Sequence, residues 1–512
     1  MARPQANVPA ATYRLQLNRE QTFADARALV DYLDALGITH LYVSPVSQAR
    51  PGSAHGYDVV DPTRVNAELG GRRGLERLAA ALRSRGMGLV IDTVPNHMAV
   101  APENRWWQDV VRRGRASPYA RFFDIDWRRS EGGDLVYRRF FNIDDLAGVR
   151  VEDAEVFDAT QRLAIELARD GIASGLRIDH IDGLRDPLAY LRKLRRRAGA
   201  QTFLVVEKVL TGDEPLPKDW PVAGTTGYDF MNIVNGLFVN RGGLQKLDET
   251  YRRLTRDDAS LPEVTYESKR YVLRELFARE MDALAHELCV LARHDAPSLR
   301  LAQEEAREAI EEVIAALGAY RTYTRDATVA ERDRRYIERA LRRARRRSER
   351  VRGATFAFLR RVLLLRIDAA RRRSDWLRFV MRWQQYTGPA TAKGLEDTAL
   401  YRYNRLISLS EVGADPEAPG PLSIPRFHEA MRDRLARWPH TMNATATHDT
   451  KRGEDARMRI DALSELPDEW SRLVRRWSRT NRALKQRVEG RVVPDANEEL
   501  LIYQALAGAW PA

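Results

Sequence analysis

The chain of 512 residues has one cysteine, Cys289, and 8 lysines among its 84 basic residues. A single cysteine excludes an internal disulfide, so folding needs no oxidising compartment, and we expect Cys289 to be a buried thiol in a helix. The scarcity of lysine leaves arginine to supply almost all of the positive charge, whose net value is +12. Because arginine replaces lysine along the whole chain, the excess of arginine indicates genomic codon bias more than phosphate binding. We therefore predict no nucleic-acid partner. The densest arginine run, residues 342–352, is expected to be a solvated helix face.

Long hydrophobic runs are also missing. No stretch reaches the roughly 18 apolar residues that a transmembrane helix requires, and the first residues, Met-Ala-Arg-Pro-Gln-Ala-Asn-Val-Pro, lack the apolar core of a signal peptide. We therefore expect a cytoplasmic protein without a membrane partner. Repeats of about 20–50 residues, which mark solenoid proteins, are absent too. The chain does contain 44% hydrophobic residues, enough for a large core.

The first half of the sequence alternates short β-branched runs with helical stretches. Such alternation predicts a parallel sheet joined by right-handed crossover helices, and its sixfold repetition predicts an α/β fold of the (β/α)8 TIM-barrel type. Strands are expected at residues 11–17, 39–46, 88–93, 175–179, 202–208 and 224–232, and helices at residues 23–36, 73–85, 159–173 and 187–198.

The second half has a different pattern. It is dominated by helical periodicity, with long amphipathic helices predicted at residues 273–293, 298–317 and 330–350. A seventh strand is expected only at residues 442–448, although one βα unit needs only about 30 residues. The sequence therefore predicts three parts: a barrel segment with six βα units over residues 1–239, an inserted helical subdomain over 240–380, and a return to the barrel over 381–512.

Three carboxylates follow apolar runs that are predicted to be strands. They are Asp179 in Gly-Leu-Arg-Ile-Asp-His, Glu207 in Phe-Leu-Val-Val-Glu-Lys and Asp449 in Thr-Ala-Thr-His-Asp. An acid in this position is out of place in a core and is typical of the mouth of a barrel, where catalytic residues lie. Arg177 precedes Asp179 by two residues, so both side chains point to the same side of the strand. Two carboxylates held close together can carry out retaining glycosyl transfer, one as nucleophile and the other as acid/base.

A single acid at a strand end is more often an exposed charge than a catalyst, so the order of several segments carries the argument. Along the chain, Asp92 is followed by Asn96-His97, then come Arg177-x-Asp179, Glu207 and His448-Asp449. This order resembles the four ordered regions of the alpha-amylase family of retaining glycoside hydrolases and transglycosylases.

The resemblance implies a role for each matched residue. Asp179 would be the nucleophile, Glu207 the acid/base and Asp449 the stabiliser of the transition state. Contacts to the sugar in the bond-cleaving subsite would come from the other matched residues and from a tyrosine in Ser-Ala-His-Gly-Tyr-Asp: Tyr57, Asp92, His97, Arg177 and His448.

Longer segments narrow the resemblance to the family of maltooligosyltrehalose synthases, from about residue 10 to the end of the chain. The segments are residues 11–17, 138–147, 219–229, 385–397 and 447–455. This resemblance implies an intramolecular transglucosylation in trehalose biosynthesis. The reducing-end α-1,4 bond of a maltooligosaccharide would become an α,α-1,1 bond. The released glucose would have to turn over in a pocket that excludes water, and residues 219–228 and 384–396, with Lys393, are candidates for its wall.

The same resemblance carries expectations about ligands and partners. It implies a linear α-1,4-glucan substrate, no cofactor, a monomer, and functional pairing with a hydrolase that releases trehalose. We expect no required metal, because Asn96, at a position that binds calcium in many amylases, has no acidic cluster as a companion in the sequence.

The end of the chain departs from the family pattern. The family continues into an eighth strand and a C-terminal β domain, whereas residues 500–512 are predicted to be helical. We therefore expect a barrel that is incomplete at its eighth strand, with reduced stability and activity. Two alternatives stay open. One is another amylase-family enzyme, a hydrolase or a 4-α-glucanotransferase; the other is a non-catalytic glucan-binding or arginine-rich interaction module.

Overall fold

The structure is a computed structural model that describes residues 8–130, 134–212, 214–366, 372–417 and 423–511. The chain folds into two compact units. Unit 1 comprises Met1–Lys208, Leu216–Thr226 and Trp438–Met442, and unit 2 comprises Val209–Pro215, Gly227–Arg437 and Asn443–Ala512. This division differs from the three predicted parts, because Trp438–Met442 is the only segment after Thr226 that belongs to unit 1.

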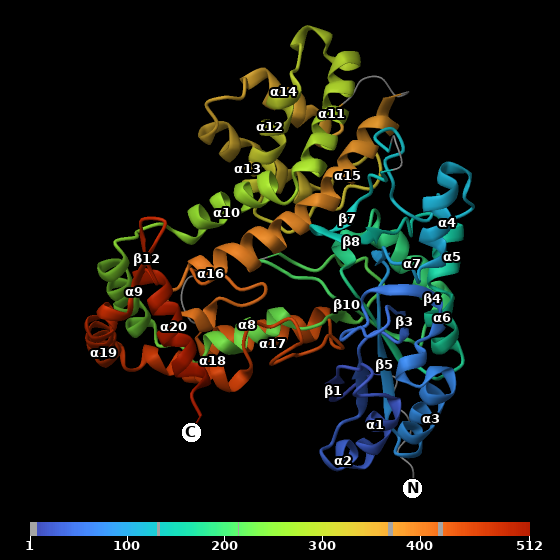
Figure 1. The fold of residues 1–512 in the computed structure, drawn as a ribbon, viewed down its shortest axis with the longest axis horizontal. Coiled ribbons are helices and arrows are strands. Elements are labelled where there is room, and N and C mark those ends of the chain that lie inside the picture. The colour runs from blue at the N-terminus through green and yellow to red at the C-terminus, as the bar shows by residue number, and fades with distance from the viewer. Residues whose placement is uncertain (1–7, 131–133, 213, 367–371, 418–422, 512) are drawn as a thin grey trace. The chain divides into compact units, whose positions relative to one another are not determined.

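Unit 1 is built on a six-stranded sheet in which all neighbouring strands are parallel (Figure 1). Five of its strands are buried along their whole length, as expected for a parallel sheet covered on both faces. The sheet is open, with β1 and β11 as its edges, which confirms an incomplete barrel. The order is β1 (Thr12–Leu15), β2 (His40–Val43), β5 (Gly88–Thr93), β9 (Gly175–Ile178), β10 (Phe203–Val206) and β11 (Gly224–Thr225).

Helices lie between the first five of these strands in sequence, as predicted, and α3 and α6 pack along the sheet (Figure 1). Two predicted helices are each divided in two, at Leu29 and at Gln161. The side chain of Gln161 accepts a hydrogen bond from the Tyr190 hydroxyl, which ties the break to a neighbouring helix. The helices are α1 (Phe23–Ala28), α2 (Val30–Ala35), α3 (Gly71–Ser84), α4 (Arg105–Arg113), α5 (Ala154–Thr160), α6 (Arg162–Arg169) and α7 (Pro187–Ala198).

Two small antiparallel sheets in unit 1 were not predicted. One pairs β3 (Ser47–Ala49) with β4 (Val59–Val65). The other has the order β6-β8-β7, made of His97–Ala99, Ile143–Gly148 and Arg139–Phe140. Both follow strands of the central sheet in sequence; the loop between β3 and β4 contains Tyr57, and β6 carries His97.

Two predicted strands need correction. The sixth covers only Gly224–Thr225, because Gly227 adopts a left-handed backbone (φ 94°) and α8 (Tyr228–Gly236) begins directly after it. The seventh, at residues 442–448, is not formed. Met442 N–H donates to the Thr225 carbonyl (3.2 Å), but the Thr225 N–H bonds to the Thr441 hydroxyl (3.1 Å) and not to backbone. A side chain thus takes the place of the next ladder bond, and the following residues enter unit 2.

Unit 2 is helical in its described part, apart from the hairpin of β12 (Gln486–Val488) and β13 (Arg491–Val493). Its larger core surrounds the fully buried Trp376 and Trp383. The helices that build this core are α10 (Leu261–Glu275), α11 (Ala278–Asp295), α12 (Gln303–Ala315), α13 (Glu331–Arg347), α14 (Gly353–Leu363) and α15 (Arg373–Thr391). The predicted helical insertion is therefore confirmed.

A second core in unit 2 joins helices from distant parts of the chain. It contains α9 (Arg241–Thr255) together with α18 (Glu454–Asp461), α19 (Pro467–Thr480) and α20 (Ala496–Ala509). The start of the predicted insertion thus packs with the end of the chain.

Two smaller expectations are confirmed. Cys289 is buried on α11, and the arginines of the run over residues 342–347 are exposed. Among the residues described, no helix combines the length and the apolar character that crossing a membrane requires.

Candidate active site

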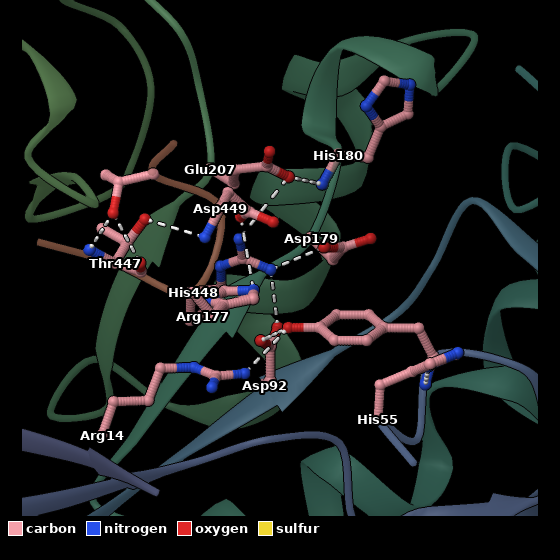
Figure 2. Close-up of polar contacts among 12 residues, drawn as sticks. Arg14, His55, Asp92, Arg177, Asp179, His180, Glu207, Thr447, His448 and Asp449 are labelled. Carbon is pink, nitrogen blue, oxygen red and sulfur yellow. Dashed lines mark hydrogen bonds and ion pairs between the residues drawn. The ribbon is translucent and has the colours of Figure 1, made fainter. Parts of the chain in front are cut away.

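One buried guanidinium, that of Arg177, organises the acids of unit 1 (Figure 2). Its Nη1 donates to Oδ1 of Asp179 at 2.6 Å and to Oδ1 of Asp92 at 2.9 Å. Its Nη2 lies 3.6 Å from Oε2 of Glu207. The sheet explains this convergence. Asp92 and Arg177 are register partners on β5 and β9. Asp179 is the first residue after β9, and Glu207 is the first residue after the neighbouring β10.

The charge of this guanidinium is fixed by its neighbours. Burial alone would lower the pKa of Arg177, but the nearby Asp92, Tyr42, Glu207 and Asp179 together raise it well above its ordinary value. Arg177 is therefore permanently cationic. It can hold two carboxylates close together in a buried place where their mutual repulsion would otherwise separate them.

Tyr57 joins the same cluster from the loop between β3 and β4. Its hydroxyl donates to Oδ2 of Asp92 at 2.5 Å and accepts from Arg14 at 3.2 Å. Burial, followed by the negative charge of Asp92, raises the pKa of Tyr57, so the phenol stays neutral and remains a donor. Gly56 shapes this loop: its φ is 82°, and a Cβ there would lie 2.9 Å from the Pro45 carbonyl oxygen.

Sequence reasoning missed two members of the cluster, Arg14 and Tyr42. They are register partners on β1 and β2, and the Tyr42 hydroxyl donates to Oδ2 of Asp92 at 3.1 Å. Asp92 therefore accepts hydrogen bonds from Tyr42, Tyr57 and Arg177, and it connects β2 to β9. A signal was present, since Arg14 is a charged residue within a predicted strand.

His97 lies on β6, buried, with its ring stacked on Phe140 at 4.1 Å. Burial, with smaller contributions from His180 and Arg138, lowers the pKa of His97 to about 3, so the imidazole is neutral near pH 7. Within the part of the chain that the structure describes, its Nε2 is buried and has no hydrogen-bond partner. A buried unpaired nitrogen is costly and is a natural place for a ligand hydroxyl.

The side-chain oxygen of Asn96, the residue before His97, already accepts a hydrogen bond from within the protein. Arg138 donates to its Oδ1 at 3.0 Å and forms an ion pair with Asp124 at 2.9 Å. Across the described ranges no group of three or more His, Cys, Asp or Glu side chains is arranged to hold a metal ion.

Glu207 is held by backbone as well as by charge. The N–H of His180 donates to its Oε2 at 2.6 Å. The next residue, Lys208, is fully buried and forms an ion pair with Asp182 at 3.1 Å. The end of β10 is thus bound on both sides to the segment that follows Asp179.

The remaining candidates belong to unit 2. Asp449 accepts a hydrogen bond from the Tyr228 hydroxyl at 2.9 Å, and His448 Nε2 lies 3.3 Å from the same Oδ2. Tyr228 is the first residue of α8 and is buried, so it fixes the orientation of Asp449. The contact of Tyr228 with Asp449 was not predicted, although Tyr228 belongs to residues 219–228, which were predicted to line the glucose pocket.

Lys393 lies on η6 (Ala392–Ala399), a π-helical continuation of α15, and its Nζ is 2.7 Å from Asp397. Such π-helical turns are frequent at functional sites. Gly394 permits α10 to approach closely, since a Cβ there would lie 2.6 Å from Cγ of the buried Lys269.

The structure therefore brings Tyr57, Asp92, Arg177, Asp179 and Glu207 together, places His97 on the aromatic ring that also contacts His180, and pairs His448 with Asp449. A parallel sheet whose strands end in these acids defines a catalytic domain of the alpha-amylase class, and residues 27–187 match the model of the alpha amylase catalytic domain.

Comparison with individual proteins narrows the class. The chain is 36% identical, over 98% of its length, to a maltooligosyl trehalose synthase of Mycobacterium tuberculosis, of which it covers 69%. The structure matches the maltooligosyltrehalose synthase of Arthrobacter ramosus with a TM-score of 0.86 and 37% identity, covering 98% of this chain and 70% of that one. It also matches the structure of a maltooligosyl trehalose synthase of Sulfolobus tokodaii, with a TM-score of 0.79 and 33% identity, covering 98% of this chain and 70% of that one. The chain belongs to the maltooligosyl trehalose synthase family.

Proposed function

We propose that this protein rearranges the reducing end of linear α-1,4-glucans, converting the last α-1,4 bond into an α,α-1,1 bond without shortening the chain. Beside membership of the family, one observation carries the proposal. Asp179 and Glu207, at the ends of adjacent strands, both contact the buried guanidinium of Arg177. A retaining double displacement needs two carboxyl groups about 5–5.5 Å apart, and we predict this separation for Asp179 and Glu207.

In the first step Oδ of Asp179 attacks the anomeric carbon of the second glucose from the reducing end. The bond from that carbon to O4 of the last glucose breaks, and Glu207 gives its proton to the leaving O4. A glycosyl ester on Asp179 and a free glucose result. Asp449, oriented by Tyr228, is assigned to electrostatic stabilisation of the oxocarbenium-like transition state.

In the second step the released glucose offers its own anomeric hydroxyl. Glu207 removes the proton, the oxygen attacks the anomeric carbon of the ester, and the Asp179 carboxylate leaves. Two inversions preserve the α configuration at the transferred sugar. Glucose has to be retained and water excluded between the steps, and we assign this to residues 219–228 and 384–396, with Lys393 as a polar contact.

Contacts to the sugar in the bond-cleaving subsite are assigned to Tyr57, Asp92, His97, Arg177 and His448. His97 supports this assignment best, because its buried Nε2 is without a partner in the described part of the chain. A sugar hydroxyl would satisfy that atom at no further desolvation cost to the protein.

Incubation of maltopentaose with the protein tests the proposal. Reducing ends should disappear while the mass of the sugar stays constant, and the product should show an α,α-1,1 anomeric signal by NMR. Shorter reducing sugars would indicate a hydrolase, and longer ones a 4-α-glucanotransferase.

The cellular setting is part of the proposal. We place the enzyme in the cytoplasm, as a monomer, upstream of a hydrolase that releases trehalose from the product. A non-reducing trehalosyl end is useful only to an enzyme that cleaves the adjacent α-1,4 bond. Size-exclusion chromatography with light scattering checks the monomer, and a coupled assay for free trehalose checks the pairing.

A further inference from the structure

The residue after the assigned nucleophile has an unusual backbone. His180 has φ 44° and ψ 51°, in the left-handed region that residues other than glycine rarely adopt. Strain of this kind persists only where the surroundings enforce it, and it concentrates at functional sites. At this position the strained backbone directs the His180 N–H to Oε2 of Glu207, over 2.6 Å (Figure 2).

The imidazole of His180 is tightly packed on three sides. It meets Phe140 edge-on, with ring centroids 5.2 Å apart, and Phe141 at the same separation. Gly183 closes the third side, since a Cβ there would lie only 2.3 Å from Cδ2 of His180. His180 as a whole is only 9% exposed, so its ring is surrounded by neighbouring side chains and makes little contact with solvent.

Phe140 couples this clamp to the rest of the site. It lies on β7, and its ring also stacks on that of His97 at 4.1 Å and packs against that of Phe141 at 4.2 Å. The small sheet β6-β8-β7 therefore holds His97 and His180 on one aromatic side chain. This gives the unpredicted sheet a function in the geometry of the catalytic strands.

We propose that His180 is a positioning residue for the acid/base: its left-handed backbone places an N–H that fixes the orientation of the Glu207 carboxyl group, and the packing of its ring offsets the strain that this backbone imposes on a residue other than glycine. The inference rests on the proposed function only in taking Glu207 as the proton donor. A carboxyl group with one oxygen anchored by a backbone donor cannot rotate freely. It therefore meets the leaving oxygen in one orientation, without side-chain reorganisation at each turnover.

The test compares three substitutions that differ in how well they accept a left-handed backbone. Glycine and asparagine adopt it readily, and a β-branched valine does not. His180→Gly and His180→Asn should keep kcat for maltopentaose within about tenfold of the unsubstituted enzyme. His180→Val should lose roughly 100-fold or more, the size of a general-acid contribution.

A second substrate isolates the acid step. α-Maltosyl fluoride has a leaving group that needs no proton, so the initial burst of fluoride from His180→Val should stay within about threefold of the unsubstituted value. Equal losses on both substrates would overturn the proposal, because the damage would then extend beyond the acid. A glycine variant as inactive as the valine variant would overturn it too.

Two further measurements keep the interpretation clear. Arg256→Val is the matched control: Arg256 also has a left-handed backbone (φ 59°), at the end of α9 in unit 2. It should lower the thermal midpoint without changing kcat more than about twofold. Crystal structures of the variants should retain the bond from residue 180 to Glu207 in the glycine form and lose it in the valine form. The opposite pattern would contradict the proposal irrespective of turnover. If the proposed function fails, the unsubstituted enzyme will make reducing products, but the comparison among variants still holds because hydrolysis uses the same acid.

Discussion

The hydroxyl of Tyr228 donates a hydrogen bond to Oδ2 of Asp449 over 2.9 Å, and Nε2 of His448 lies 3.3 Å from the same oxygen. A hydrogen bond to a charged group contributes about 1.5–3 kcal/mol. If Tyr228→Phe loses the lower part of this range in the transition state, kcat falls roughly tenfold. The phenyl ring fills the same buried space, so the thermal midpoint should change little. Steady-state kinetics on maltopentaose measures the effect.

Tyr190→Phe is the control for this variant. Tyr190 is equally buried and donates to Gln161, away from the candidate acids. It should affect stability and not kcat. If both variants have the same kinetics, Tyr228 does not orient Asp449 for catalysis.

Asp179→Asn should abolish turnover while leaving the chain folded. The amide is nearly isosteric with the carboxylate but cannot form a glycosyl ester, so kcat should fall by about 1,000-fold or more. Arg177 keeps Asp92 and Glu207 as partners, so the circular-dichroism spectrum and the thermal midpoint should stay close to those of the parent. Asp186→Asn is a matched control, because Asp186 caps α7 and asparagine caps equally well. Substantial turnover by Asp179→Asn would show that the nucleophile is another residue.

Glu207→Gln should also lose turnover on maltopentaose, by about 100-fold or more, because glutamine cannot donate the proton. Its carbonyl oxygen can still accept the His180 N–H, so the local structure should persist. Added azide should partly restore reaction of α-maltosyl fluoride, since azide attacks the glycosyl ester on Asp179 without a general base, and the second inversion makes the product α-maltosyl azide, which NMR identifies by its anomeric signal. Full activity of the variant on maltopentaose would remove Glu207 from the acid/base role.

His97 makes stability depend on pH. Its folded pKa is about 3 against an ordinary 6.5, because burial disfavours the charged imidazole. Between these values the unfolded chain binds the extra proton, so the free energy of unfolding rises with pH, by up to roughly 1.4 kcal/mol per unit. The stability is complete above about pH 6.5 and is lost as the pH falls toward 3. In urea titrations at pH 7 and pH 5, His97→Gln should show a smaller difference than the parent. An equal difference would show that His97 is not buried in the neutral form.

Much of the sheet and the acid cluster could be predicted, because both depend on local patterns. A buried parallel strand is an apolar run, and β5 and α7 were predicted to the residue. Asp92 and Arg177 meet because strand register follows from those runs. Arg177, Asp179 and Glu207 became candidates because they belong to several charged segments that follow one another in a characteristic order along the chain, since a single charge at a strand end is more often just exposed.

What escaped prediction depends on contacts between distant residues. The strand expected at residues 442–448 fails because the Thr441 side chain bonds to Thr225 in place of backbone. The sixth strand stops early because Gly227 turns the chain into α8. The clamp on His180 needs β7, a two-residue strand with no periodicity of its own. Sequence periodicity reports which side of an element is buried, but not which side chain from elsewhere covers it.

The central claim is that the released glucose never leaves the enzyme before it is joined again, and isotope crossover tests it most directly. Maltopentaose labelled with carbon-13 in its reducing-end glucose is converted in the presence of a large excess of unlabelled glucose. The account predicts that each molecule of non-reducing product carries the label in its 1,1-linked terminal glucose, at the isotopic purity of the starting sugar, and that the free glucose stays unlabelled. Unlabelled glucose in the product, or label in the free pool with a shortened glucan, would contradict it.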